Sequence, residues 1–236
     1  LDAFLIGFEL SCRVGDWLGR AHYEAGFHQT ATAGAFGAAA AACRATGLDA
    51  ATTAQALALT ATRAAGLKSQ FGTMGKPCNA GFAAAAGVEC ALLAAHGVAS
   101  GPVALEGPQG FGPTHAGAAR DGAFDGLGAV WVLSGVSHKL HACCHGTHAA
   151  IEALRTLGPD PAAVGAVTLT VNPRWLAVCD IPEPRTGLEA KFSYRLTAAM
   201  ALAGVDTAAL GSFTDALCGR PDLVALRDRV RVEADP

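Results

Sequence analysis

The chain has 236 residues, enough for one large domain or two smaller ones with a buried core. Hydrophobic residues make up 51% and charged residues 16%, a composition that excludes a disordered chain. The formal net charge is −3 and basic residues form no block, so we expect no nucleic-acid partner. Apolar runs such as "AGAFGAAAAAC" fall short of the ~20 residues of a membrane span, and we expect no membrane partner.

Two further features concern the origin of the chain. It opens at Leu1 inside an amphipathic segment that lacks the features of a signal peptide, from which we expect a piece of a longer polypeptide. Its eight cysteines show no regular spacing, which favours reduced thiols and a cytoplasmic location.

Residues 1–135 are predicted to form an all-α helical domain, because apolar and small residues recur at helical spacing. We expect four helices here, at residues 1–21, 33–46, 50–67 and 80–96. Thr30 or Thr32 can cap the second helix, Gly47 can end it, and Asp49 can cap the third. The Gly- and Pro-rich segment that follows, residues 101–125, is predicted to be a loop.

Residues 136–236 follow a different pattern, which predicts an α+β domain. Thr147 can cap a short helix, and alternating Val167, Leu169 and Val171 predict a strand. A further helix is expected at residues 188–204, and the last segment, from residue 221, is expected to be a short helix that runs into a strand.

The segment "SHKLHACCHGTH" holds four histidines at spacings of three, four and three, namely His138, His141, His145 and His148. On one helical face these side chains could bind a metal ion. Gly146 and the expected cap at Thr147 interrupt such a helix, and no cluster of carboxylates lies nearby in the sequence. Ordinary surface or core histidines are therefore the favoured alternative, and we predict no metal.

Two other segments carry possible site residues. In "AHYEAGFHQTATAGAFG", His22, His28, Thr30 and Thr32 lie just before or within a helix start, where backbone N–H groups suit a carboxylate ligand. In "FGTMGKPCNAG", Lys76 lies in a glycine-rich turn where it could meet an anion or act as a base. Each segment also has an ordinary interpretation, as a helix cap with a part-buried histidine and as a solvated loop lysine.

Together these segments resemble the MmgE/PrpD family, over nearly the whole chain. The motifs that carry the resemblance are "HYEAGFHQTATAGAFGAAAAACRATGLD", "FGTMGKPCNAGFAAAAGVECALLAAHG", "HKLHACCHGTHAAIEAL" and "PRTGLEAKFSY". That family includes 2-methylcitrate dehydratase, cis-aconitate decarboxylase and iminodisuccinate epimerase. The resemblance implies a mainly α fold, with an all-α helical domain, a smaller α+β lid domain and an active site in the cleft between them. It also implies a homodimer that needs no cofactor.

The resemblance assigns roles to individual residues. The implied catalytic residues are His28, Lys76, Lys139, Cys144 and His148, and the implied substrate-binding residues are His22, Thr30, Thr32 and Asn79. Cys144 occupies a position where cis-aconitate decarboxylase has histidine, and Asn79 one where the family often has histidine. His138, His141 and His145 are then incidental, and an acidic motif that lies upstream in the family has no counterpart in this sequence.

The implied function is that of a cofactor-independent lyase of the 2-methylcitrate dehydratase type, acting on a small di- or tricarboxylate. Lys76 and Lys139 are expected to hold carboxylates. His28, with an ordinary pKa of about 6.5, is expected to transfer a proton next to a carboxylate. Decarboxylation and epimerisation are alternatives within the family, and a helical scaffold without activity is the alternative outside enzymes.

Overall fold

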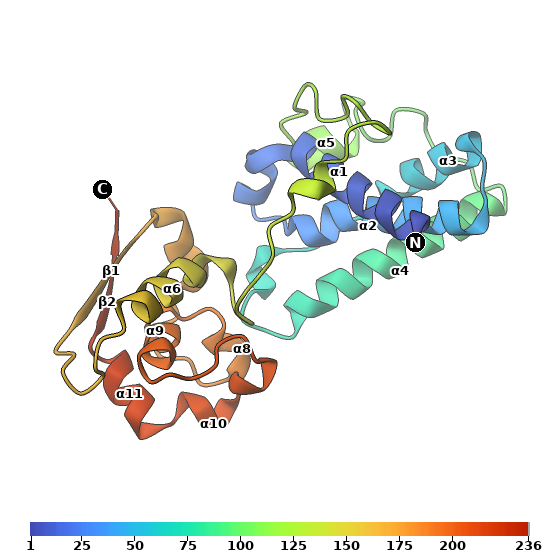
Figure 1. Ribbon diagram of the computed structural model, residues 1–236. Coiled ribbons are helices and arrows are strands. Elements are labelled where there is room, and N and C mark those ends of the chain that lie inside the picture. Colours follow the sequence, from blue (N-terminus) through green and yellow to red (C-terminus); the bar gives the residue numbers. More distant parts are fainter. Residues whose placement is uncertain (236) are drawn as a thin grey trace. The chain divides into compact units, whose positions relative to one another are not determined.

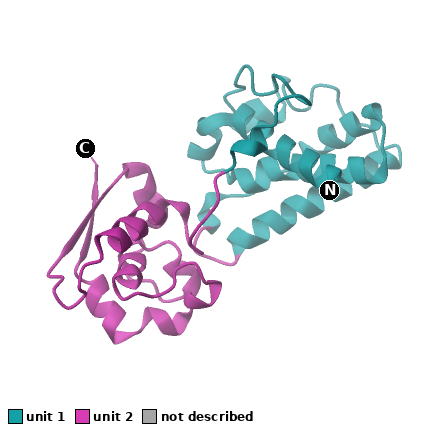
Figure 2. Ribbon diagram, in the orientation of Figure 1, with its two compact units in different colours: residues 1–70, 75–136 teal, residues 71–74, 137–236 magenta. Residues whose placement is uncertain are grey.

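The computed structural model describes residues 1–235, which form two compact units (Figures 1 and 2). Unit 1 comprises residues 1–70 and 75–136, and unit 2 comprises residues 71–74 and the chain from residue 137 onward. The short segment 71–74 belongs to unit 2 because Phe71 stacks on Phe192, with ring centroids 6.0 Å apart.

The regular secondary structure of unit 1 consists of helices, and long loops join them after residue 95. Its α-helices are α1 (Asp2–Glu24), α2 (Gln29–Thr46), α3 (Ala50–Thr60), α4 (Gly75–Ala95) and α5 (Phe111–Thr114), and its 3₁₀ turns are η1 (Lys68–Gln70) and η2 (Val132–Gly135). Helix α2 packs against both α1 and α4, and α3 packs on α4 (Figure 1). At its centre lies a cluster of buried side chains that includes Trp17, Leu18, Phe36 and Phe111.

Small residues bring the helices of unit 1 together. A Cβ on Gly37 of α2 would lie 2.3 Å from the carbonyl oxygen of Gly7 on α1. A Cβ on Gly87 of α4 would lie 2.5 Å from the backbone of Ala35 and of Ala39 on α2. The alanine- and glycine-rich composition therefore lets the helix backbones approach more closely than larger side chains would permit.

The helix boundaries of unit 1 agree with the sequence at some positions only. Asp49 caps α3 by accepting a hydrogen bond from the Thr52 amide, and Gly47 ends α2 in the left-handed conformation, both as predicted. Thr30 and Thr32 do not cap α2, because the helix already begins at Gln29 with His28 at its N-cap. The third predicted helix is also shorter than expected and ends at Thr60.

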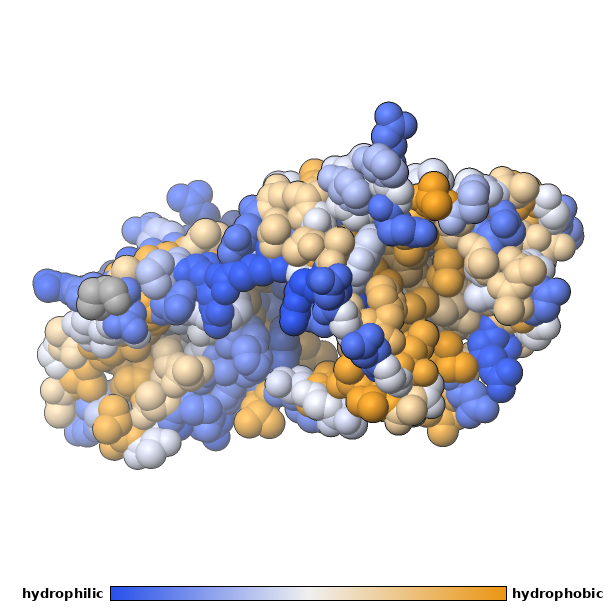
Figure 3. Space-filling model, turned by 90° about the horizontal axis from the view of Figure 1, so that it is seen from above, coloured by the Kyte–Doolittle hydropathy of each residue, from blue (hydrophilic) through white to orange (hydrophobic). Residues whose placement is uncertain are grey.

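Helix α4 begins five residues earlier than predicted, so that it has 21 residues. By length and composition alone it is apolar enough to cross a membrane, which corrects the expectation that no segment reaches that length. Helices of a soluble core pass the same test, and 39% of the apolar window is buried inside the protein. Figure 3 shows apolar residues gathered on part of the surface that unit 1 presents.

Unit 2 combines short helices with two strands. Its helices are α6 (His148–Leu157), α7 (Leu176–Cys179), α8 (Gly187–Ala190), α9 (Tyr194–Leu202), α10 (Asp215–Cys218) and α11 (Pro221–Arg227), with 3₁₀ turns η3 (His145–Thr147), η4 (Pro173–Trp175) and η5 (Leu210–Ser212). The strands β1 (Val167–Val171) and β2 (Val230–Ala234) pair in parallel, with Val167 opposite Val230 and Val171 opposite Ala234. Helix α9 packs on α6 and α11, and these helices supply most of the core (Figure 1).

The expected architecture of an all-α helical domain plus a smaller α+β lid domain is wrong. The chain is mainly helical, at 56% of residues, and across residues 1–235 the two-stranded parallel pair is the one sheet. In unit 2 the strand predicted around Val167 is present, but it pairs with β2 alone. The two strands form too small a sheet to give unit 2 the expected α+β architecture. In addition, the helix predicted at residues 188–204 is split into α8 and α9, because Ser193 caps α9 by accepting from the Leu196 amide.

Candidate functional site

In unit 1 the structure brings His28 and Asn79 into contact. His28 lies at the N-cap of α2 and Asn79 lies near the start of α4, and both side chains are buried. The Asn79 amide nitrogen, Nδ2, is 3.1 Å from Nδ1 of His28 and 3.3 Å from the carbonyl oxygen of Leu67. The backbone at His28 is held by its amide, which donates to the carbonyl of Gly66 at 3.0 Å.

Lys76 affects the pKa of the same histidine, His28. It is the second residue of α4 and is half-buried, so it lies in a helix rather than in the predicted glycine-rich turn. Pro77 is compatible with this position because the first turn of a helix needs no N–H donor. Burial, and after it the charge of Lys76, lowers the pKa of His28 from 6.5 to about 4. The expected proton transfer by His28 depended on a pKa of about 6.5, and the pKa in the folded protein is well below it.

His22 and Thr32 form a buried pair beneath the start of α2. His22 donates from Nδ1 to the carbonyl of His115 at 2.6 Å, and its Nε2 accepts from the Thr32 hydroxyl at 2.8 Å. The ring also stacks on Phe27 at 4.6 Å, and burial lowers its pKa. The Thr32 amide in turn donates to the His28 carbonyl at 3.1 Å, so this pair supports the segment that carries His28.

Of the residues predicted to bind substrate in unit 1, Thr30 alone is exposed. It lies in the first turn of α2, next to Gln29. His22, Thr32 and Asn79 are buried, and their hydrogen bonds go to other protein groups.

In unit 2, Lys139 and His148 lie close to the carbonyl of Cys143. The exposed Lys139 ammonium donates to this oxygen at 3.5 Å, and a hydrogen bond from His148 reaches the same backbone group. His148 is the first residue of α6 and is buried, and burial together with His141 and His145 lowers its pKa. Among the side chains of residues 1–235, its Nε2 is the one buried nitrogen or oxygen that lacks a hydrogen-bond partner.

The remaining histidines of this segment lie in different surroundings. His141 is buried, and its ring nitrogens contact Thr207 at 2.8 Å and Glu152 at 2.9 Å. His138 and His145 are exposed. Within residues 1–235 no group of three or more His, Cys, Asp or Glu side chains is placed to hold a metal ion.

Cys144 lies in a buried cluster together with Cys179, Phe192 and Tyr194. Its amide donates to the carbonyl of Lys191 at 2.8 Å, which fixes the backbone between Lys139 and His148. The Tyr194 hydroxyl of this cluster donates to the carbonyl of Gly146 at 3.0 Å, which ties the cluster to the turn before His148.

Sequence reasoning missed the backbone groups and the two side chains that complete these arrangements: the carbonyls of Leu67 and His115, and the side chains of Glu152 and Thr207. Glu152 could have been noticed, since it lies four residues after His148 on the same helix. His115 and Thr207 are 93 and 66 positions from their histidine partners, and Leu67 is 12 positions from Asn79, so no local pattern points to these groups.

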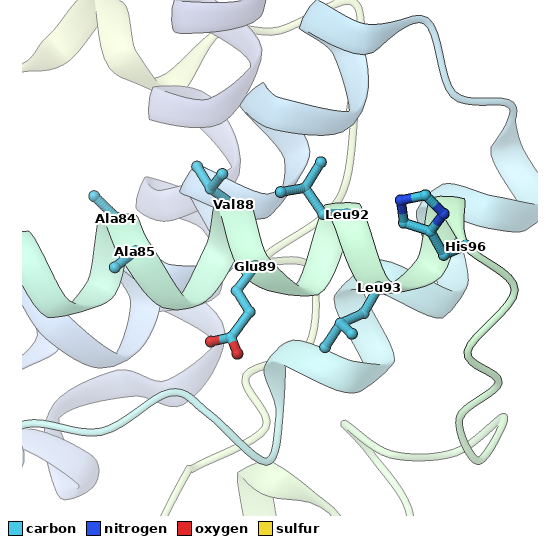
Figure 4. A pocket seen from close by; sticks show the side chains of 7 residues that line it. All are labelled: Ala84, Ala85, Val88, Glu89, Leu92, Leu93 and His96. Carbon is cyan, nitrogen blue, oxygen red and sulfur yellow. The ribbon is translucent and has the colours of Figure 1, made fainter.

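A separate shallow pocket runs along α4 (Figure 4). It is lined by Ala84, Ala85, Val88, Glu89, Leu92, Leu93 and His96. None of the predicted site residues contributes to it, and its wall is almost wholly apolar, so it does not suit a carboxylate substrate.

Comparison with known proteins identifies the family. Residues 1–121 match the MmgE/PrpD N-terminal domain, and residues 141–236 match the MmgE/PrpD C-terminal domain. A relative from Aspergillus oryzae, the cis-aconitate decarboxylase-like protein oryM, is 34% identical over 178 residues. That match covers 70% of this chain, and the chain spans 37% of the length of the relative. The chain belongs to the MmgE/PrpD family.

Proposed function

We propose that this chain carries acid–base and carboxylate-binding groups of a lyase that acts on a small di- or tricarboxylate and needs no cofactor. Family membership supports the proposal. The observation that carries it is the pairing in unit 1, where half-buried Lys76 lies near enough to buried His28 to depress its pKa. A fixed positive charge beside a hydrogen-bonding imidazole suits a substrate that develops negative charge on oxygen.

The chemistry of such a substrate explains why lysines are needed. Loss of a proton or of CO₂ next to a carboxylate leaves an electron pair that spreads onto the carboxylate oxygens. Lys76 and Lys139 are proposed to hold carboxylates and so to stabilise this charge. His148 is proposed to transfer a proton, because its Nε2 has no partner within the part of the protein described, residues 1–235.

Three reactions fit these groups, namely dehydration, decarboxylation and epimerisation. We propose decarboxylation as the first to test, because the relative from Aspergillus oryzae is described as cis-aconitate decarboxylase-like. Dehydration of a 2-methylcitrate-type acid follows, since it needs the same carbanion-stabilising groups. The cytoplasmic location and the homodimeric state of the protein remain predictions.

The experiment is an NMR assay of the full chain in D₂O with citrate-, aconitate- and succinate-type acids. The proposal predicts that one acid is converted. Decarboxylation and epimerisation form a new C–H bond and place deuterium there, whereas dehydration removes the proton next to a carboxylate and places none in the product. Loss of CO₂, loss of water or inversion without either then names the reaction. No conversion and no exchange with any of the acids would contradict the proposal and favour a scaffold without activity.

A further inference from the structure

The orientation of the Asn79 amide is fixed by its second hydrogen bond. Nδ2 of Asn79 lies 3.3 Å from the carbonyl oxygen of Leu67, and a carbonyl oxygen can only accept. Rotating the amide by half a turn would place the Asn79 Oδ1 against that oxygen, with two acceptors facing each other. The end of the amide that faces Leu67 and His28 is therefore the N–H donor end.

This orientation decides where the proton of His28 lies. Nδ1 of His28 is 3.1 Å from Nδ2 of Asn79, so it faces an N–H group and must accept with its lone pair. In a neutral imidazole one nitrogen accepts and the other carries the hydrogen. The hydrogen of His28 is therefore on Nε2.

We propose that Asn79 is a positioning residue that holds His28 as the neutral Nε2–H tautomer, so that His28 donates a hydrogen bond to a negatively charged substrate oxygen. The tautomer follows from the hydrogen bonds alone, and the identity of the substrate oxygen rests on the proposed function. Asn79 was expected to bind substrate directly, and this inference gives it a role through His28 instead.

The surroundings of His28 also oppose its protonation. An imidazolium carries hydrogen on both nitrogens, and a hydrogen on Nδ1 would point at the Asn79 donor. Both side chains are buried, at 7% exposure for His28 and 6% for Asn79. Water therefore does not accept a hydrogen bond from a protonated Nδ1 of His28. The charge of Lys76, on the same helix as Asn79, acts in the same direction.

A proton must then be moved by another group. Nε2 already carries a hydrogen and cannot take a second one, and Nδ1 is covered by Asn79. In a decarboxylation the bond from carbon to the leaving carboxylate breaks and its electron pair enters the remaining carbon–carboxylate system. CO₂ departs, and a separate acid supplies the proton that forms the new C–H bond. Throughout, His28 keeps its hydrogen and stabilises the oxygen that gains charge.

Long-range ¹H–¹⁵N NMR of the imidazole rings tests the tautomer without any substrate. The full chain is labelled with ¹⁵N, and the signals of His28 are assigned by their absence in His28→Gln. We expect, at neutral pH, one set of signals in which Nε2 is protonated and Nδ1 is not. A protonated Nδ1, whether as the other tautomer or as imidazolium, would overturn the inference.

Substitution of Asn79 distinguishes positioning from a merely structural role. Asn79→Asp offers Nδ1 an acceptor in place of a donor, so hydrogen should move to Nδ1 and the pKa of His28 should rise. Asn79→Leu removes the donor and should leave a mixture of tautomers. Thr60→Val, which changes another fully buried polar side chain of unit 1, serves as the control and should leave the His28 signals unchanged. An unchanged tautomer in both Asn79 variants would contradict the assignment, and if neither variant folds the wild-type spectrum still decides it.

The outcome is separable from that of the proposed function. If His28 is the Nε2–H tautomer but no polycarboxylate is converted, the inference stands and the proposed function fails. If an acid is converted while Nδ1 is protonated, the proposed function stands and the inference fails. In an active enzyme, Asn79→Asp should lower turnover by at least ~100-fold with a smaller change in KM, as for loss of a transition-state hydrogen-bond donor.

Discussion

The rings of His141 and His148 meet edge to face, with centroids 4.9 Å apart, and they differ in hydrogen bonding. Both nitrogens of His141 have protein partners, whereas Nε2 of His148 is buried without one. A fully bonded imidazole therefore packs against one that keeps a nitrogen available, which is the arrangement expected if His141 supports and His148 reacts. In unit 2, two histidines of one short sequence segment thus differ in their hydrogen bonding.

The first prediction concerns the support of His141. Thr207→Val should lower the free energy of unfolding by about 1–3 kcal/mol, because it leaves Nδ1 of a buried imidazole without its partner at 2.8 Å. Denaturation by urea, followed by circular dichroism, measures the change. Thr170→Val on the exposed face of β1 is the matched control and should stay within about 0.5 kcal/mol of the wild type. Equal stability of the two variants would show that His141 needs no partner at Thr207.

The second prediction concerns the turn that precedes His148. A Cβ on Gly146 would lie 2.9 Å from the Trp175 ring and 3.1 Å from the Cys179 sulfur. Gly146→Ala should therefore destabilise the protein by about 1–3 kcal/mol, as overpacking of a core does. Gly165→Ala, with nothing within 4 Å of the added carbon, is the control and should change stability little. If Gly146→Ala unfolds at the same urea concentration as Gly165→Ala, the packing at this turn is looser than described.

The third prediction is the pH dependence of stability. The pKa of His28 is about 4 in the folded protein and 6.5 when exposed, so the unfolded chain binds the proton first as the pH falls. The contribution of neutral His28 to the free energy of unfolding is complete above pH 6.5. It is lost as the pH falls from 6.5 to 4, by about 3 kcal/mol in total. His28→Gln should remove this part of the acid sensitivity, whereas Thr60→Val, which changes no titrating group, should retain it.

Urea titrations at several pH values in that window measure the effect. His22 is also buried with a lowered pKa and adds to the acid sensitivity of the wild type, so the difference between wild type and His28→Gln isolates His28. Parallel curves of stability against pH for these two proteins would show that His28 takes up protons as easily in the folded state as in the unfolded one.

The fourth prediction separates the two lysines of unit 1. Lys76→Ala should lower turnover of the converted acid by at least ~100-fold, because it removes the charge proposed to stabilise the carbanion. Lys68, which lies over the Tyr23 ring at 3.8 Å from its centroid, provides the comparison. Lys68→Ala should retain turnover within a few-fold. Similar rates in both variants would remove Lys76 from the proposed site.

Local signals in the sequence predicted local structure well. The Asp49 cap, the Gly47 helix end and the alternating strand at Val167 depend on residues within a few positions of one another. The start of α2 was missed because it is set by tertiary contacts. The His28 amide donates to Gly66, and Phe27 forms an antiparallel bridge with Leu67, which together place the first helical residue at Gln29.

The site was predictable in part, through the resemblance of four motifs to a known family. Those motifs named His28, Lys76 and Asn79, which unit 1 does bring together. They did not show that Asn79 contacts His28, since 51 positions separate the two residues. Nor did they show that burial and Lys76 lower the pKa of His28, because the ordinary value belongs to an imidazole in water.

The most direct test of the proposed function is the exchange and turnover assay in D₂O, run in parallel on the wild type, Lys76→Ala and Lys68→Ala. We predict that the wild type and Lys68→Ala convert one di- or tricarboxylate, and that Lys76→Ala converts it at least ~100-fold more slowly. Absence of conversion and of exchange in a folded wild type, or equal rates in all three proteins, would contradict the account.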